Sequence, residues 1–176
     1  MTLQTEITKD RDTVDRRTVS PAISPRIRPA RWGDKDALLQ MIHALAHHHG
    51  DEPELTMAAL IDLMGAGLPW LRLLVAEDSS GESEGLLGYA GLVGGVQLQH
   101  GRKNMDLHHL FIRQDMRGRG VGRALIDAAR QEAVALDCHR LTVSTQTHNT
   151  RAQETYLACG FEPRDITGAH FAMQLR

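Results

Sequence analysis

The chain has 176 residues, of which 41% are hydrophobic and 24% are charged, and its formal net charge is −2. This length predicts one domain with a core of its own, and the near-neutral charge excludes a bulk basic field that would attract nucleic acid or an anionic membrane. The two cysteines, Cys138 and Cys159, are too few for a disulfide scaffold, so we expect free thiols. Because the sequence has neither a bilayer-spanning apolar run nor a signal peptide, we expect a cytoplasmic protein.

The first elements are expected after a polar leader. Residues 1–25 are charged and unpatterned, and we expect a flexible N-terminal tail before a single domain at 26–176. A short strand at 27–30 precedes a helix that Asp34 caps and that ends near Gly50.

This first helix ends in three successive histidines at 47–49. Successive helical residues point about 100° apart, so the three imidazoles cannot converge on one ion from the helix. We expect a solvated helix end here and no metal site.

The remaining pattern alternates strands and helices. The expected elements are a helix capped by Thr56 and ending near 64, strands at 71–77 and 86–93, a turn region at 97–104, a strand at 107–112, a helix after 122, a strand at 140–145, a helix from 149 or 150 to 160, an extended piece at 161 and a last strand at 170–175. The order β-α-α-β-β-β-α-β-α-β-β predicts an α/β domain with a mixed sheet.

The most informative stretch is 106–129. An apolar strand enters a loop in which arginine and glycine alternate, and an amphipathic helix follows at once. Glycine-loop N–H groups and the positive end of a helix bind anions, most often phosphate. Four arginines add local positive charge within eleven residues: Arg113, Arg117, Arg119 and Arg123.

Two well-known phosphate loops are excluded. A P-loop needs Gly-Lys-Ser/Thr, but Gly122 is followed by Arg123 and Ala124. A dinucleotide loop needs a third glycine where Arg123 stands. The pattern that remains is Arg117-x-x-Gly120-x-Gly122, which fits either a phosphate cradle or a plain tight turn.

With this pattern the sequence resembles the Gcn5-related N-acetyltransferase superfamily, whose signature R/Q-x-x-G-x-G/A stands between a strand and a helix. The resembling segments are LVAED at 74–78, GYAG at 88–91, HLFI at 109–112, RGRGVG at 117–122 and N-x-x-A-x-x-x-Y-x-x-x-G-F from Asn149 to Phe161. The resemblance covers most of 27–175 and is greatest to the diamine and thialysine acetyltransferase-like group. It implies a mixed, mostly antiparallel central sheet flanked by helices, and a homodimer.

The resemblance also implies a reaction. An acetyl group would pass from acetyl-CoA to a primary amine of a small molecule, by direct attack in a ternary complex. The backbone of Leu110, Phe111 and Ile112 would bind the pantetheine arm, and Asn149 would contact the same arm or simply cap its helix. The residues implied for the pyrophosphate are Arg117, Gly118, Arg119, Gly120, Val121, Gly122 and Arg123.

Two residues are expected to handle protons. Tyr156 matches the family's general acid, which protonates the leaving thiolate; the alternative is a core tyrosine. His108 stands where polyamine-type relatives carry a glutamate base, and it is either the base or a structural histidine. On a regular strand, His108 shares a face with Asp106, and His109 takes the other face.

The replaced glutamate leaves the function open between three hypotheses. The first is an active N-acetyltransferase on a small amine. The second is a catalytically weak acyl-CoA-binding module, and the third is an acetyltransferase that acts on protein amines.

Overall fold

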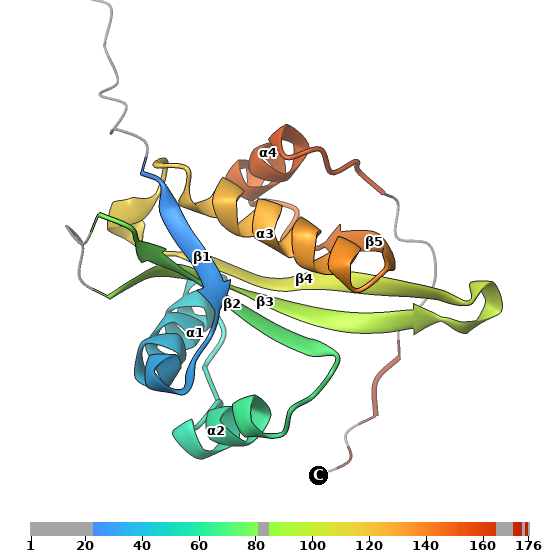
Figure 1. The fold of residues 1–176 in the computed structure, drawn as a ribbon, viewed down its shortest axis with the longest axis horizontal. Helices are drawn as coiled ribbons and strands as arrows, with labels where there is room; N and C mark the ends of the chain where they lie inside the picture. Colours follow the sequence, from blue (N-terminus) through green and yellow to red (C-terminus); the bar gives the residue numbers. More distant parts are fainter. Residues whose placement is uncertain (1–22, 81–84, 165–170, 174, 176) are drawn as a thin grey trace, which may run out of the picture.

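The computed structural model describes residues 23–80, 85–164, 171–173 and 175. A five-stranded sheet runs through its centre in the order β1-β2-β3-β4-β5, with helices on both faces (Figure 1). The strands are β1 (Pro25–Pro29), β2 (Leu71–Asp78), β3 (Leu86–Gln97), β4 (Arg102–Ile112) and β5 (Cys138–Val143). The helices are α1 (Lys35–His49), α2 (Met57–Gly65), α3 (Val121–Ala135) and α4 (Thr150–Ala158).

The sheet is mixed but mostly antiparallel. Strands β1 to β4 pair antiparallel with their neighbours, and β5 pairs parallel to β4. A parallel pair needs a crossover connection, which α3 supplies between β4 and β5. This architecture confirms the α/β fold class with helices flanking a mixed sheet.

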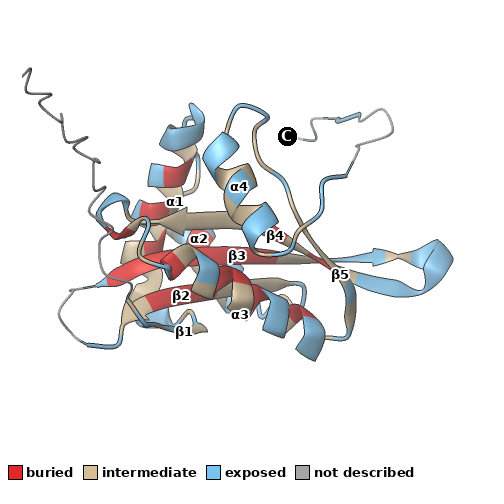
Figure 2. Ribbon diagram, turned by 90° about the horizontal axis from the view of Figure 1, so that it is seen from above, coloured by how far each residue is buried: buried red, intermediate tan, exposed pale blue. Residues whose placement is uncertain are grey.

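The core lies in two layers, one on each face of the sheet. One cluster joins the sheet to α3 and includes Leu107 and Leu125, whereas the other joins it to α1 and α2 and includes Leu38 and Tyr89. Figure 2 shows the buried residues gathered along the sheet and on the inner sides of the helices. Fully burying a leucine side chain contributes roughly 1.5–3 kcal/mol to folding, so these layers hold the helices against the two faces of the sheet.

An ion-pair network joins the start of α1 to the sheet. The Arg28 guanidinium on β1 donates to the Asp34 carboxylate at 2.7 Å and to the Glu77 carboxylate of β2 at 2.8 Å. Asp34 occupies the predicted N-cap position of α1, but its carboxylate accepts from the Arg31 N–H at 2.6 Å and makes no capping hydrogen bond to the helix. The predicted cap on α2 is present, since Thr56 accepts from the Ala59 N–H at 3.2 Å.

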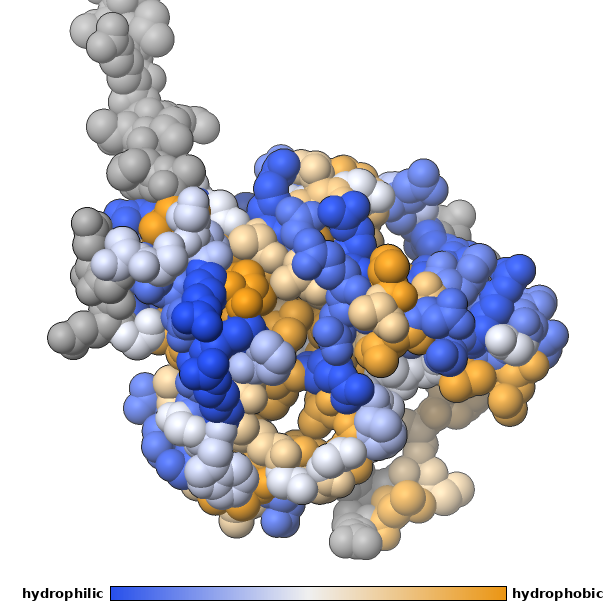
Figure 3. Space-filling model, in the orientation of Figure 1, coloured by the Kyte–Doolittle hydropathy of each residue, from blue (hydrophilic) through white to orange (hydrophobic). Residues whose placement is uncertain are grey.

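Two predicted boundaries differ from the structure. Residues 97–104 were expected as a turn, but β3 and β4 continue into this region and pair as far as Gln97 and Arg102, leaving a short turn at 98–101. Backbone pairing, which needs no hydrophobic pattern, extends this hairpin beyond the core, so its outer end is exposed (Figures 1 and 2). Figure 3 shows mostly hydrophilic residues over that end.

The two strands predicted last are not formed by the described residues 161–164, 171–173 and 175. The rest of that segment, and the predicted tail up to residue 22, lie outside the described residues. Of the helices in the described ranges, none combines the length and the apolar character that crossing a membrane requires.

Candidate active site

Strand β5, the last in the order of the sheet, parts from β4 midway along β4. Their pairing runs from Lys103 with Cys138 to Leu107 with Val143, whereas β4 continues to Ile112. Beyond Leu107, the edge of β4 that faces away from β3 therefore has no strand beside it among the described residues. Backbone N–H and C=O groups on such an edge are ready to pair with a ligand.

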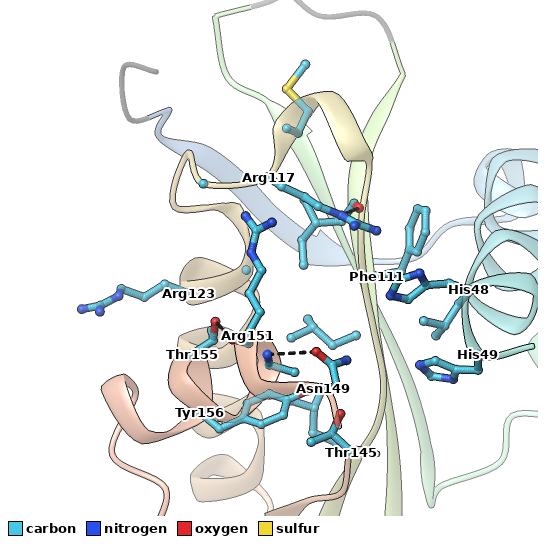
Figure 4. Close-up of a pocket in the computed structure, with 18 of the residues that line it drawn as sticks. His48, His49, Phe111, Arg117, Arg123, Thr145, Asn149, Arg151, Thr155 and Tyr156 are labelled. Carbon is cyan, nitrogen blue, oxygen red and sulfur yellow. Dashed lines mark hydrogen bonds between the residues drawn. The ribbon is translucent and has the colours of Figure 1, made fainter. Parts of the chain in front are cut away.

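A pocket of about 350 Å³ lies in this parting. Its walls are the last part of β4, the loop that leads into α3, the start of α4 and the end of α1 (Figure 4). The lining residues used below are His48, His49, His108, Leu110, Phe111, Ile112, Arg117, Gly118, Gly120, Gly122, Arg123, Thr145, Asn149, Arg151 and Tyr156. Residues from four separate elements thus meet at one site.

We call one end of the pocket the loop end; it consists of residues 117–123 and the first turn of α3. Gly118 and Gly120 have φ angles of 77° and 89°, a region that side-chain-bearing residues rarely adopt. Gly120 is the N-cap of α3, so the next N–H groups, from Val121 onward, have no partner within the helix. A Cβ at Gly122 would lie 3.3 Å from the Ile112 side chain, so glycine lets the loop pack closely against β4.

The loop end carries uncompensated positive charge. Asp115, the acidic residue nearby, is bound by Arg113 at 2.6 Å, and this guanidinium holds the pKa of the Asp115 carboxyl below its usual value. Arg117 donates through Nε to the Ile112 carbonyl at 3.2 Å. In the part of the chain that the structure describes, no ion pair forms at Arg117, Arg119 or Arg123. The loop end therefore favours an anion on two grounds, backbone N–H groups and guanidinium charge.

Most sequence-predicted binding residues line the pocket, but two do not. The Val121 side chain is 1% exposed and packs in the α3 layer of the core, so only its backbone can serve a ligand. Arg119 is absent from the pocket lining, and its carbonyl accepts from the Ile23 N–H at 3.0 Å. Arg123 borders the pocket, yet its side chain points away from the gap between β4 and α4 (Figure 4).

Sequence reasoning missed Arg151, whose side chain extends from α4 toward the loop that carries Arg117 (Figure 4). The available signal was its position two residues after Asn149, at a helix start next to the expected phosphate site. His48 and His49 were recognised only as a helix end. Both are exposed at the end of α1 and also line the pocket.

Tyr156 and Asn149 lie on the α4 side of the pocket (Figure 4). Burial raises the pKa of Tyr156, so its hydroxyl is protonated at neutral pH and can donate a proton or a hydrogen bond. The ring of Phe161 contacts it edge-on at 5.8 Å between centroids. Asn149 caps α4 by accepting from the Ala152 N–H at 3.1 Å, and its place in the lining makes a ligand contact compatible with that cap.

A β-bulge changes the faces of the β4 histidines. Gly91 of β3 pairs with His109 and Leu92 pairs with Leu107, which leaves His108 as an extra residue on β4. The two imidazoles stack, with centroids 4.8 Å apart and planes 13° apart. The prediction that they point to opposite faces was therefore wrong, because the bulge breaks the strict alternation. We call His48, His49, His108 and His109 the histidine end of the site.

This histidine-rich region is not arranged as a metal centre. Within residues 23–80, 85–164, 171–173 and 175, no group of three or more His, Cys, Asp or Glu side chains is placed to hold an ion. His48 and His49 both line the pocket, and their ring centroids lie 5.8 Å apart.

The family model described as "Acetyltransferase (GNAT) family" matches residues 37–161. The chain belongs to the acetyltransferase (GNAT) family. It is thus an N-acetyltransferase, which confirms the superfamily that the motifs predicted.

Individual GNAT relatives agree with this assignment. The thialysine N-epsilon-acetyltransferase of Bos taurus is 29% identical over 149 residues, which are 81% of this chain and 86% of the bovine protein. The streptothricin acetyltransferase of Escherichia coli is 28% identical over 97 residues, covering 53% of this chain and 56% of that protein. A solved aminoglycoside acetyltransferase from an uncultured soil metagenomic sample shares the fold, with a TM-score of 0.71, 12% identity and coverage of 85% and 97%.

GNAT acetyltransferases use acetyl-CoA as cosubstrate, and the pocket fits that molecule. The glycine loop with its positive φ angles, the first-turn N–H groups of α3 and the Arg117 guanidinium suit a diphosphate. The open edge of β4 at Leu110–Ile112 suits an arm that contains amide groups, since amides pair with strand edges.

Proposed function

We propose that the protein transfers the acetyl group of acetyl-CoA to a primary amine of a small molecule, by direct attack in a ternary complex. In this proposal the diphosphate lies at the loop end and the pantetheine arm runs along the open edge of β4. Tyr156 is the general acid and His108 is the general base.

One observation carries the proposal: the parting of β4 from β5 joins three parts of the proposed chemistry in one pocket. The loop end lies at one side of it, Tyr156 lies on α4, and His108 lies on the bulge of β4. Both reactants can therefore approach from the two sides of the sheet and meet where the strands separate.

The proton balance assigns a task to each residue. His108 takes a proton from the ammonium form of the acceptor, whose free nitrogen then forms a bond to the thioester carbonyl carbon. The carbon–sulfur bond breaks, and the leaving thiolate receives the proton of the Tyr156 hydroxyl. The attacking nitrogen loses its second proton as the amide forms, and this proton restores the Tyr156 hydroxyl, while His108 releases its proton to solvent. Because burial keeps that hydroxyl protonated, it is ready for this role.

The acceptor is expected to be a small amine. The matched relatives are named for thialysine and streptothricin, and the solved neighbour is described in complex with sisomicin. These names support a small-molecule acceptor over a protein acceptor. Which small amine is the acceptor is a question for experiment.

The experiment is a thiol-release assay with acetyl-CoA and a panel of primary amines, with the acetylated product identified by mass. We expect release that depends on the amine and on active protein. Binding of acetyl-CoA without any amine-dependent release would contradict the proposal and favour an acyl-CoA-binding module. Acetylation of a peptide N-terminus or lysine, with no small amine used, would favour the protein-directed alternative.

We also propose a homodimer. Apolar side chains are exposed on the outer hairpin, at Val96 and Leu98, and in the C-terminal segment, at Phe171, Met173 and Leu175. Contiguous exposed apolar surface marks protein–protein interaction sites, and in this proposal a second copy of the chain covers these side chains. Light scattering coupled to size-exclusion chromatography should give twice the mass of the chain, and a monomer at all concentrations would refute it.

A further inference from the structure

The bulge on β4 does more than expose one histidine. Before it, Met105 and Leu107 face the α3 layer of the core, and after it Leu110 and Ile112 face that same layer. Phe111 faces the α1 layer, where it packs with Tyr89. The extra residue thus shifts the alternation by one position and places both His108 and His109 on the face that α1 covers.

His108 is held from two sides. Its ring stacks on His109 at 4.8 Å, and its Nδ1 lies 3.7 Å from Oδ2 of Asp106. The other carboxylate oxygen of Asp106 accepts from the Thr142 hydroxyl of β5 at 2.8 Å, which fixes the carboxylate. The His108 side chain is 62% exposed and lines the pocket, so a substrate amine can reach it.

His109 is itself fixed by a tyrosine. The Tyr89 residue is fully buried, and its hydroxyl lies 3.0 Å from Nδ1 of His109. The Tyr89 hydroxyl can donate to Nδ1 or accept from it, but only donation leaves no buried phenol proton without a partner. Nδ1 accepts only when the neutral ring carries its proton on Nε2, so the contact favours the neutral Nε2–H tautomer of His109.

Three neighbours reinforce the neutral state of His109. Burial lowers its pKa first, and the positive charge that His108 and His49 can carry lowers it further. Tyr89 faces it from β3, His108 from its own strand and His49 from α1. Burial also raises the pKa of Tyr89, so that the phenol remains a donor.

We propose that Asp106, His109 and Tyr89 are positioning residues that hold His108 as the proton acceptor of acetyl transfer. This inference rests on the proposed acetyltransferase function. When the ammonium of the acceptor gives its proton to His108, the resulting imidazolium lies between the Asp106 carboxylate and a neutral ring. A protonated His109 would repel that imidazolium, and the bond from Tyr89 prevents this state.

The first test is imidazole nitrogen NMR on the full chain, with histidines assigned by single substitution. His109 should show the Nε2–H tautomer at neutral pH, and Tyr89→Phe should release it to a mixture of tautomers that protonates at higher pH. His109 found as the Nδ1–H tautomer, or protonated at neutral pH in the native protein, would overturn the inference. This readout does not depend on turnover, so it remains informative if the proposed function fails.

The second test is kinetic. His108→Gln should lower kcat by about 100-fold, and Tyr89→Phe and Asp106→Asn should each lower it on the order of tenfold, with the KM for acetyl-CoA unchanged. His100→Gln, on the distant hairpin turn, is the control. A kcat equal to that of the native protein in both positioning variants would overturn the inference.

Discussion

The loop end and the histidine end of the site are built in different ways. The loop end uses backbone N–H groups at a helix start, held by glycines in left-handed conformations. The histidine end uses side chains from α1 and β4, brought together by a bulge. A site made of backbone groups requires particular residue types, such as glycine, at fixed spacing in the sequence. A site made of side chains depends instead on how two elements pack together. The first therefore constrains the sequence far more than the second.

The largest effect is expected where the backbone makes the site. In Gly120→Asp a carboxylate stands within about 4 Å of the expected diphosphate, which costs roughly 4 kcal/mol at the effective dielectric of a protein surface. Acetyl-CoA affinity, measured by titration calorimetry, should fall on the order of 1000-fold.

Gly101→Asp is the matched control, since Gly101 also has a positive φ, of 59°, but lies on the hairpin turn. It should bind acetyl-CoA like the native protein. Equal loss in both variants would show that backbone strain, and not the cradle, explains the effect.

The next prediction separates binding from chemistry. Tyr156→Phe should lower turnover by about 100-fold, the usual contribution of a general acid, while the Kd for acetyl-CoA changes little. Steady-state kinetics and calorimetry on the same preparation measure both quantities. Unchanged turnover would remove Tyr156 from the mechanism and leave it as a core residue that packs on Phe161.

A smaller effect tests which of two arginine side chains contacts the bound diphosphate. Arg151 points toward the loop end and Arg123 points away from the gap (Figure 4). A charged hydrogen bond is worth roughly 1.5 kcal/mol or more, so Arg151→Ala should weaken acetyl-CoA binding about tenfold. Arg123→Ala should have a clearly smaller effect. The reverse order would show that the bound complex uses the arginine of α3 instead.

The smallest effect concerns the support of the histidine end. Arg28 holds the pKa of Asp34 below its usual value, so this carboxylate stabilises the fold fully above its unfolded pKa of about 3.9. The contribution disappears as pH falls through the folded pKa. Asp34→Asn should lower the free energy of unfolding by about 1–2 kcal/mol at neutral pH, and by less at pH 3.

Urea denaturation at both pH values gives this difference. Asp36→Asn is the control, because the Asp36 side chain is 68% exposed and, among the described residues, forms an ion pair with its neighbour Lys35. An Asp34 effect that is the same at pH 3 and pH 7 would contradict an electrostatic origin.

The sequence predicted the parts of the molecule that local patterns determine. Strands, helices and the glycine loop followed from apolar spacing and from Gly120 and Gly122, and the fold class is confirmed. The stacking of His108 on His109 was not predictable, because a bulge depends on the register between two strands. Arg151 and His49 were missed for a related reason: only tertiary packing brings α4 and the end of α1 to one pocket.

The parting of β4 and β5 has a consequence for handling the protein. An open strand edge inside a sheet is a template on which other chains can pair, and it therefore promotes aggregation. A ligand seated along Leu110–Ile112 would cover that edge and, at 100 times its Kd, add about 2.7 kcal/mol to the free energy of unfolding. Purification and storage with coenzyme A should accordingly raise the melting temperature and keep the protein dispersed on warming.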